Sequence, residues 1–360
     1  MLRGSFVMAF LIGVRIAFGS SSAQSATKLL IKFIPPDFPT QVALGPHWTV
    51  YLDGIIDDDA AERFAEEIAK NGVNQGDVFL NSPGGNLLAG MKLGRLIRKH
   101  GLITHIAKET IGTQRGATGE CLSACVFAFV GGYYRFQTRD SMIGVHRFSR
   151  LSPSTADLDL AQMVSGTITA YLSEMGVDIA LFELMSRVGK DEIYLLPPTE
   201  AKRLRVVNNG ILPAEWTIEA IDGTKSFDGT LYLRGVQETL VGTGKAIFLC
   251  AKGKVFFEPM YEAGKNAKLI ADSAIRHSIR FDNQFIPLDT PVQPLTVSNG
   301  YVGAVFSLKS EHLARIGNAQ SIGYAAYGLN PDLFWGFTVE ATGAEERIRG
   351  FLKSCRPGKD

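Results

Sequence analysis

The chain has 360 residues, of which 46% are hydrophobic and 20% are charged, which is enough to bury the cores of two domains rather than one. Its formal net charge is +1, so the strongly basic surface of a nucleic-acid-binding protein is not expected and nucleic acid is excluded as a partner. No stretch reaches the roughly 20 apolar residues that a membrane-spanning helix needs.

Residues 1–23 predict a cleaved secretory signal. Arg3 precedes an apolar stretch from Phe6 to Phe18, and small residues follow up to Ala23, which is the order found in signal peptides. Arg15 interrupts the apolar stretch. We expect export, to a bacterial periplasm or beyond it, with removal of the leader near Ala23 and no integral membrane segment in the mature protein.

Residues 45–209 predict a first domain in which strands and helices alternate, as they do in βαβ units. The helix over 89–99 has its apolar residues at helical spacing and ends at Gly101. The expected elements are strands over 50–56, 78–80 and 102–106, and helices over 60–70, 89–99, 156–174 and 179–188.

A glycine turn follows the second of these strands, with the sequence Asn81-Ser82-Pro83-Gly84-Gly85. A strand that passes into a helix through glycines leaves backbone N–H groups free, and free N–H groups can hold an oxyanion. The plain alternative is a turn with no chemical role, since proline and glycine are the ordinary residues of turns.

Ser123 directly precedes an apolar run, Ala124 to Val130, which predicts a buried helix. The N-terminus of a helix favours developing negative charge. The alternative is an ordinary N-cap serine. The segment over 107–120, which separates the third strand from Ser123, is interpreted either as a lid or as a surface loop.

His146 ends a short apolar segment, Met142 to Val145, and so lies at the edge of an expected strand. A base near a serine is the minimum for acyl transfer. A lone histidine is more often structural, but the succession of a glycine turn, Ser123 and His146 favours a catalytic site, because such a site is recognised by the roles of its members together.

Residues 216–360 predict a second, smaller and mainly β domain, joined through 204–214. It holds no catalytic motif, and His277 and His312 are isolated, so no metal site is expected. The expected elements are strands over 231–233, 246–249, 255–257, 301–308 and 334–339, and a helix over 344–353.

Four cysteines allow three disulfide connectivities. Cys121 and Cys125 bracket Ser123, and residues four apart on a helix come within about 6 Å, which permits a disulfide. Cys250 and Cys355 would then tie the two ends of the second domain. The alternative is that Cys121 and Cys125 are small buried residues.

The stretch from about residue 50 to residue 209 resembles the Clp protease proteolytic subunit and its relatives of the ClpP/crotonase fold, especially predicted periplasmic ClpP-like proteins. The match lies in Ser82 to Gly85, in Leu122-Ser123-Ala124 and in His146. The resemblance implies an α/β fold, a ClpP/crotonase-like spiral of βαβ units. It also implies a homo-oligomer that acts on a peptide or protein substrate without a cofactor or metal.

The resemblance also implies the roles of the site residues. Ser123 would be the nucleophile, His146 the general base and Asp191 the residue that orients the imidazole, with Asp178 as a rival for that third role. The oxyanion would be held by backbone N–H groups of the glycine turn and of the residue after the nucleophile, namely Gly84, with Gly85 as its neighbour, and Ala124.

Two functions follow as hypotheses. The first is an exported ClpP-like serine peptidase that cleaves peptide or ester bonds by a Ser-His-Asp acyl-enzyme mechanism. The second is a non-catalytic periplasmic protein that uses the same fold to bind a protein partner. Acyl-thioester chemistry, which related folds perform, is a weaker third hypothesis, because it needs no serine–histidine pair.

Overall fold

The computed structural model describes residues 15–17, 28–109, 117–148, 157–189, 191–221, 230–329 and 334–355. The chain divides between Gly210 and Ile211 into two compact units. The predicted leader lies outside the described residues except for β1 (Arg15–Ala17), whose backbone pairs antiparallel with β10 (Glu192–Leu195). Within the described part of the chain, no helix is long and apolar enough to cross a membrane.

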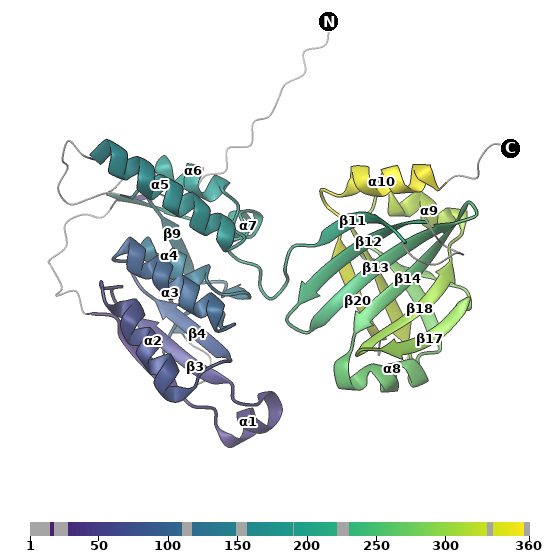
Figure 1. Cartoon of the computed structure of the whole chain (residues 1–360), viewed down its shortest axis with the longest axis horizontal. Helices are drawn as coiled ribbons and strands as arrows, with labels where there is room; N and C mark the ends of the chain where they lie inside the picture. Colours follow the sequence, from purple (N-terminus) through teal and green to yellow (C-terminus); the bar gives the residue numbers. More distant parts are fainter. Residues whose placement is uncertain are drawn as a thin grey trace, which may run out of the picture. The chain divides into compact units, whose positions relative to one another are not determined.

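The first unit is built on a sheet in the order β2-β3-β4-β5-β6, with β8 also paired to β5 (Figure 1). The central strands β3, β4, β5 and β8 are parallel, and β2 and β6 add antiparallel edges. The strands are β2 (Leu30–Ile34), β3 (Trp48–Asp53), β4 (Gly76–Asn81), β5 (Ile103–Lys108), β6 (Ala117–Thr118) and β8 (Arg135–Gln137).

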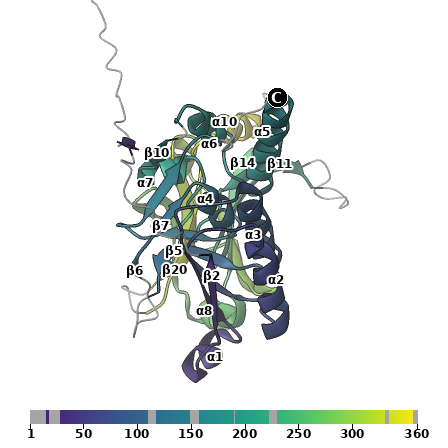
Figure 2. The same cartoon turned by 90° about the vertical axis from the view of Figure 1, so that its left-hand side faces the viewer.

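Helices α2 (Ala60–Asn71) and α3 (Leu87–Lys99) lie on the same side of this sheet (Figure 2), and the shorter α1 (Phe38–Leu44) precedes β3. Helix α2 buries apolar residues at helical spacing and ends at Gly72, whose left-handed φ of 64° closes the last turn. Helix α3 begins at Asn86, whose side chain accepts a hydrogen bond from the backbone of Ala89.

A second sheet of the same unit, in the order β1-β10-β9-β7, carries the segments that follow the glycine turn. Strand β7 (Glu120–Leu122) pairs parallel with β9 (Met142–Val145), and β10 pairs antiparallel with β9. The remaining helices of this unit are α4 (Ala124–Phe129), which is buried along its whole length, α5 (Asp157–Glu174), α6 (Ala180–Ser186) and α7 (Pro198–Arg203). The predicted α/β class is confirmed, and the spiral of βαβ units stays a prediction.

The second unit packs two antiparallel sheets face to face. One has the order β11-β12-β13-β14-β18-β17, with β11 (Glu215–Ala220), β12 (Leu231–Thr239), β13 (Gly242–Ala251), β14 (Lys254–Glu262), β17 (Gln293–Ser298) and β18 (Tyr301–Ser307). The other has the order β16-β15-β19-β20, with β15 (Arg276–Phe281), β16 (Gln284–Pro287), β19 (Ser321–Tyr327) and β20 (Phe334–Glu340).

The core of the second unit draws on both sheets, with Phe248 and Phe257 from one and Ile279 and Val339 from the other. Helices α9 (Ser310–Ile316) and α10 (Glu345–Ser354) lie at one end of the unit, and α8 (Ala267–Ser273) lies at the opposite end (Figure 1). The short helix η1 (Gly264–Asn266) precedes α8.

Candidate active site

The glycine turn lies against the turn that carries Ser123. Gly84 and Gly85 both have positive φ, 108° and 139°, a backbone region in which other residues are strained. A Cβ at Gly84 would lie 2.8 Å from the Leu122 carbonyl oxygen and 2.8 Å from the Cβ of Ser123. Glycine is therefore needed for this close approach.

Ser123 occupies a sharp turn between β7 and α4. Its φ is 54° and its ψ is −121°, and a non-glycine residue held at positive φ costs of order 1–3 kcal/mol and is common at active sites. Its N–H donates to the Gly144 carbonyl at 2.8 Å. Ser123 is in the N-cap position of α4, but its side chain makes no capping hydrogen bond, which argues against the ordinary N-cap interpretation.

The side chain of Ser123 instead reaches His146. His146 Nε2 lies 2.7 Å from Ser123 Oγ, and the pairing of β7 with β9 places Leu122 beside Gly144 and so brings the two residues together. Burial lowers the pKa of His146, and the backbone of Arg147 opposes this in part. A neutral imidazole of this kind can accept the serine proton.

The carboxylate of the predicted triad is not bonded to His146. His146 Nδ1 is buried, and no carboxylate of the described residues lies at hydrogen-bond distance from it. Asp191 is exposed on the turn before β10, and Asp178 accepts a hydrogen bond from the Ala180 backbone at 2.9 Å and so lies at the start of α6. The role of Asp191 as the orienting residue stays a prediction.

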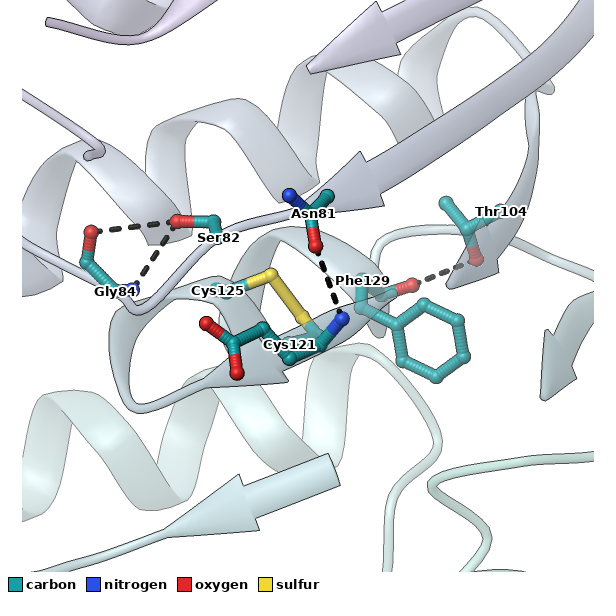
Figure 3. The surroundings of a disulfide bond; sticks show 8 residues. Asn81, Ser82, Gly84, Thr104, Cys121, Cys125 and Phe129 are labelled. Carbon is teal, nitrogen blue, oxygen red and sulfur yellow. Dashed lines mark hydrogen bonds between the residues drawn. A yellow bond between two sulfur atoms is a disulfide. The ribbon is translucent and has the colours of Figure 1, made fainter. Parts of the chain in front are cut away.

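The backbone donors near Ser123 differ in what they already bind. The Gly84 N–H donates to Ser82 Oγ at 3.1 Å (Figure 3). The N–H groups of Gly85 and of Ala124, the first residue of α4, make no hydrogen bond within the described part of the chain. Gly85 and Ala124, rather than Gly84, thus have N–H groups free to bind an anion.

The structure decides the disulfide connectivity that the sequence left open: Cys121 is joined to Cys125 and Cys250 to Cys355. The first pair does not lie on one helix as the spacing argument assumed. Cys121 is in β7 and Cys125 is in α4, so the bond crosses the strand-to-helix turn that holds Ser123 (Figure 3).

Three residues that support this region were not singled out from the sequence. Asn81 accepts a hydrogen bond from the Glu120 backbone at 3.1 Å and so joins β4 to β7 (Figure 3). Arg135 is buried and donates to three backbone carbonyls behind α4, and Arg98 donates to the Gly131 carbonyl at 2.7 Å. The sequence does contain a signal for Arg135, because this arginine closely follows the apolar run from Ala124 to Val130 and the pair Gly131-Gly132.

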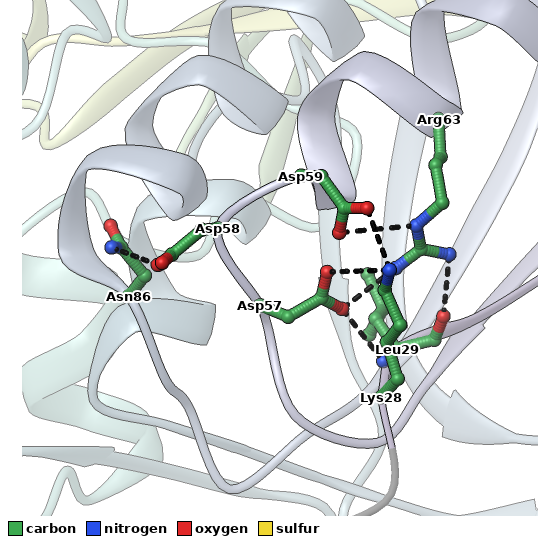
Figure 4. A network of polar contacts seen from close by, with 7 residues as sticks. All are labelled: Lys28, Leu29, Asp57, Asp58, Asp59, Arg63 and Asn86. Carbon is green, nitrogen blue, oxygen red and sulfur yellow. Dashed lines mark hydrogen bonds and ion pairs between the residues drawn. The ribbon is translucent and has the colours of Figure 1, made fainter.

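A polar network holds the segment that faces the glycine turn (Figure 4). Asn86, which follows Gly85, donates to Asp58 at 2.5 Å. Arg63 donates to Asp57 at 2.7 Å, and Asp57 in turn accepts from the Leu29 backbone at 3.0 Å. These acidic residues precede α2 and anchor the loop that contains Ile56, against which Gly85 packs.

The described residues contain no group of three or more histidine, cysteine or acidic side chains that could hold a metal ion. No family model matches the chain, and no curated protein matches it. Among solved structures the chain is similar to a mutant of a membrane-bound stomatin-specific protease, with 19% sequence identity and a TM-score of 0.33 over 44% of this chain and 75% of that one. A likeness at this level does not assign the fold or the activity.

Proposed function

We propose that the protein is an exported serine hydrolase that cleaves peptide or ester bonds through an acyl-enzyme. The observation that carries the proposal is the 2.7 Å contact between Ser123 Oγ and His146 Nε2. Ser123 has a positive φ, and its side chain makes no hydrogen bond to the first turn of α4. Backbone strain of this kind is typical of active-site residues.

In the proposed reaction, Ser123 Oγ attacks the substrate carbonyl carbon while His146 Nε2 takes the hydroxyl proton. The carbonyl oxygen becomes an oxyanion, held by the N–H groups of Gly85 and Ala124. The tetrahedral intermediate expels the amine or alcohol, which receives the proton from His146. Water then attacks the acyl-Ser123 ester with His146 again as base, releasing the acid and restoring Ser123.

The setting of this reaction is part of the proposal. Two disulfides suit an oxidising compartment, and the sequence of residues 1–23 predicts a signal for export. The substrate would be a peptide or protein in the periplasm or outside the cell, and the resemblance suggests a homo-oligomer.

A second candidate function is a protein of the same fold that binds a protein partner without catalysis. The buried Nδ1 of His146 favours it, because no carboxylate within the described part of the chain bonds to this atom. A triad needs its third member to hold the imidazole in the tautomer that accepts the serine proton. The two candidates differ in whether Ser123 reacts with an electrophile.

The test is reaction of the purified protein with a fluorophosphonate probe, followed by intact mass. We expect a single adduct in the wild type, none in Ser123→Ala and strongly reduced labelling in His146→Ala. Ser186→Ala, which removes an exposed hydroxyl from α6, should label like the wild type. A folded wild-type protein that does not react would support the partner-binding function instead.

Asp191→Asn, with Asp178→Asn as its matched control, tests the third member in the same assay. Because Asp191 is exposed, we expect labelling to fall by less than about tenfold, as for a serine–histidine pair. Loss of about 10⁴-fold, as in a working triad, would show that Asp191 reaches His146 during the reaction.

A further inference from the structure

The Cys121–Cys125 disulfide spans the residue that the proposed reaction uses as nucleophile. The two Cα atoms are 5.1 Å apart, and both cysteines are fully buried. Ser123 is the middle residue of the five that the bond encloses. Any change in the separation of the two sulfur atoms therefore acts on the φ and ψ of the turn at Ser123.

One end of the bond is fixed to the strands that carry the other parts of the site. Cys121 is paired with Ile143 in β9, the strand that His146 directly follows. On the opposite side, β7 is joined to the start of the glycine turn, because Ser82 N donates to the Glu120 carbonyl at 2.7 Å and Leu122 N donates to the Ser82 carbonyl at 3.0 Å.

The other end is fixed to the helix that supplies a backbone donor. Cys125 is the second residue of α4, directly after Ala124, whose N–H is free. The disulfide thus links the strand beside the histidine and the glycine turn to the first turn of α4. It adds a second covalent connection, beside the backbone, between parts that must keep their spacing during acyl transfer.

The elements on both sides of Ser123 are short, which is why a covalent link matters. Strand β7 has 3 residues and α4 has 6, so few backbone hydrogen bonds oppose relaxation of the positive φ at Ser123. The Ser123 N–H bond to Gly144 is one of them. A short helix and strand are marginal without tertiary support, and the disulfide supplies such support at the strained residue.

We propose that Cys121 and Cys125 are positioning residues whose disulfide holds Ser123 in its reactive geometry, so that the hydrolase works in its oxidised form and loses rate when the bond is reduced. This inference rests on the proposed function. A dithiol reductant would give two electrons and two protons to the bond, leaving two cysteine thiols and the oxidised dithiol. Activity would then depend on an oxidising compartment, such as the one to which the proposed export signal would direct the chain.

The test compares two pairs of substitutions. In Cys121→Ala/Cys125→Ala, we expect the fluorophosphonate labelling rate to fall about 10²-fold, the usual cost of misplacing a reacting group by about 1 Å. In Cys250→Ala/Cys355→Ala, which removes the disulfide of the second unit, the rate should equal that of the wild type. An unchanged rate in a folded Cys121→Ala/Cys125→Ala variant would overturn the inference.

Chemical reduction of the Cys121–Cys125 bond tests the same inference without replacing either cysteine. In the Cys250→Ala/Cys355→Ala background, treatment with dithiothreitol and partial denaturant opens the remaining bond, as alkylation and mass would verify. After refolding, the reduced protein should label about 10²-fold more slowly, and reoxidation should restore the rate. Equal rates in the reduced and reoxidised forms would contradict the inference.

Hydrogen exchange at the Ser123 amide separates failure of this inference from failure of the proposed function. Loss of the disulfide should speed exchange there, since the bond to the Gly144 carbonyl depends on the turn, and leave β12 to β14 of the second unit unchanged. A wild type that never labels refutes the hydrolase. Unchanged exchange at Ser123 in Cys121→Ala/Cys125→Ala refutes the disulfide's positioning role, whatever the labelling.

Discussion

At the scale of single residues, the candidate site depends on which groups are already bonded. Ser82 Oγ accepts the Gly84 N–H, and Asp178 accepts the Ala180 N–H. Gly84, expected to hold the oxyanion, and Asp178, the rival third member of the triad, therefore already have partners of their own. Ser123 and His146 are bonded to each other. The groups left for the proposed reaction are therefore this pair and the N–H groups of Gly85 and Ala124.

The pH dependence of the reaction follows from the burial of His146. Burial lowers its pKa below the ordinary value of 6.5, and only the neutral imidazole can take the serine proton. The labelling rate should be constant at neutral pH and fall as the pH drops through the pKa of the folded protein, with a midpoint below 6.5. Measuring the rate of fluorophosphonate labelling across acid and neutral pH checks this.

A second half-buried histidine provides the control. Burial also lowers the pKa of His277, which lies in the second unit and bonds to the Tyr324 hydroxyl. His277→Phe should leave the midpoint of the labelling profile unchanged. A midpoint at or above 6.5 in the wild type, or one that moves in His277→Phe, would contradict the assignment of this titration to His146.

At the scale of elements, α4 is supported at both ends. Its first turn is tied by Cys125 to β7. Behind its last turn, Arg135 donates to the carbonyls of Val130, Met175 and Arg205 at 2.8–3.0 Å. Burial lowers the pKa of Arg135 to about 9, so the side chain remains charged at neutral pH and its donors remain available to these carbonyls.

Removal of this arginine should loosen α4. We expect Arg135→Met to lower the free energy of unfolding by about 2–4 kcal/mol, because buried carbonyls that lose a donor cost about 1–3 kcal/mol each and Arg98 also donates to two of the three, Val130 and Met175. Hydrogen exchange of the α4 amides measures the effect within the first unit.

The matched control is Arg187→Met. Arg187 pairs with Glu183 on the surface of α6, and 71% of its side chain is exposed, so its loss should change stability by less than about 1 kcal/mol. Equal effects of the two substitutions would show that Arg135 does not hold the end of α4.

At the scale of the whole molecule, the two units have separate cores and separate disulfides. The Cys250–Cys355 bond joins positions 105 residues apart and connects β13 to the end of α10. Trp216 in β11 donates through its indole to the Glu340 carbonyl at 2.7 Å, so the start and the end of the second unit are also joined by a hydrogen bond.

Loss of this disulfide should therefore destabilise the second unit alone. Closing a loop of about 100 residues restricts the unfolded chain, and removing such a bond typically costs about 2–5 kcal/mol. In Cys250→Ala/Cys355→Ala, we expect the free energy of opening measured by hydrogen exchange to fall by that amount in β12 to β14. The exchange rates of α2 and α3 should stay unchanged. Equal acceleration in both units would show that they unfold together.

The elements that the sequence located best are those whose limits are set locally. Helix α2 (Ala60–Asn71) is closed by Gly72, and α3 (Leu87–Lys99) is capped by Asn86, because caps and apolar spacing act over a few residues. In the second unit the sequence did not predict β11, β15, β16, β17 and β19. Strand β17 alternates weakly, being exposed at almost every position, and β19 is buried along most of its length, so neither has the alternation that marks a half-buried strand.

The sequence alone determined the α/β class and the succession of glycine turn, serine and histidine, and it left three possible pairings of the four cysteines. Only the tertiary structure decided that Ser123 bonds to His146, that the Gly84 N–H is engaged by Ser82, and that Cys121 faces Cys125 across a turn. It also decided that no carboxylate of the described residues bonds to Nδ1 of His146. The physical reason is the distance along the chain over which each effect acts. Propensity and periodicity act along the chain, whereas these contacts depend on the register of β7 with β9, which the sequence specifies only through the packing of the whole unit.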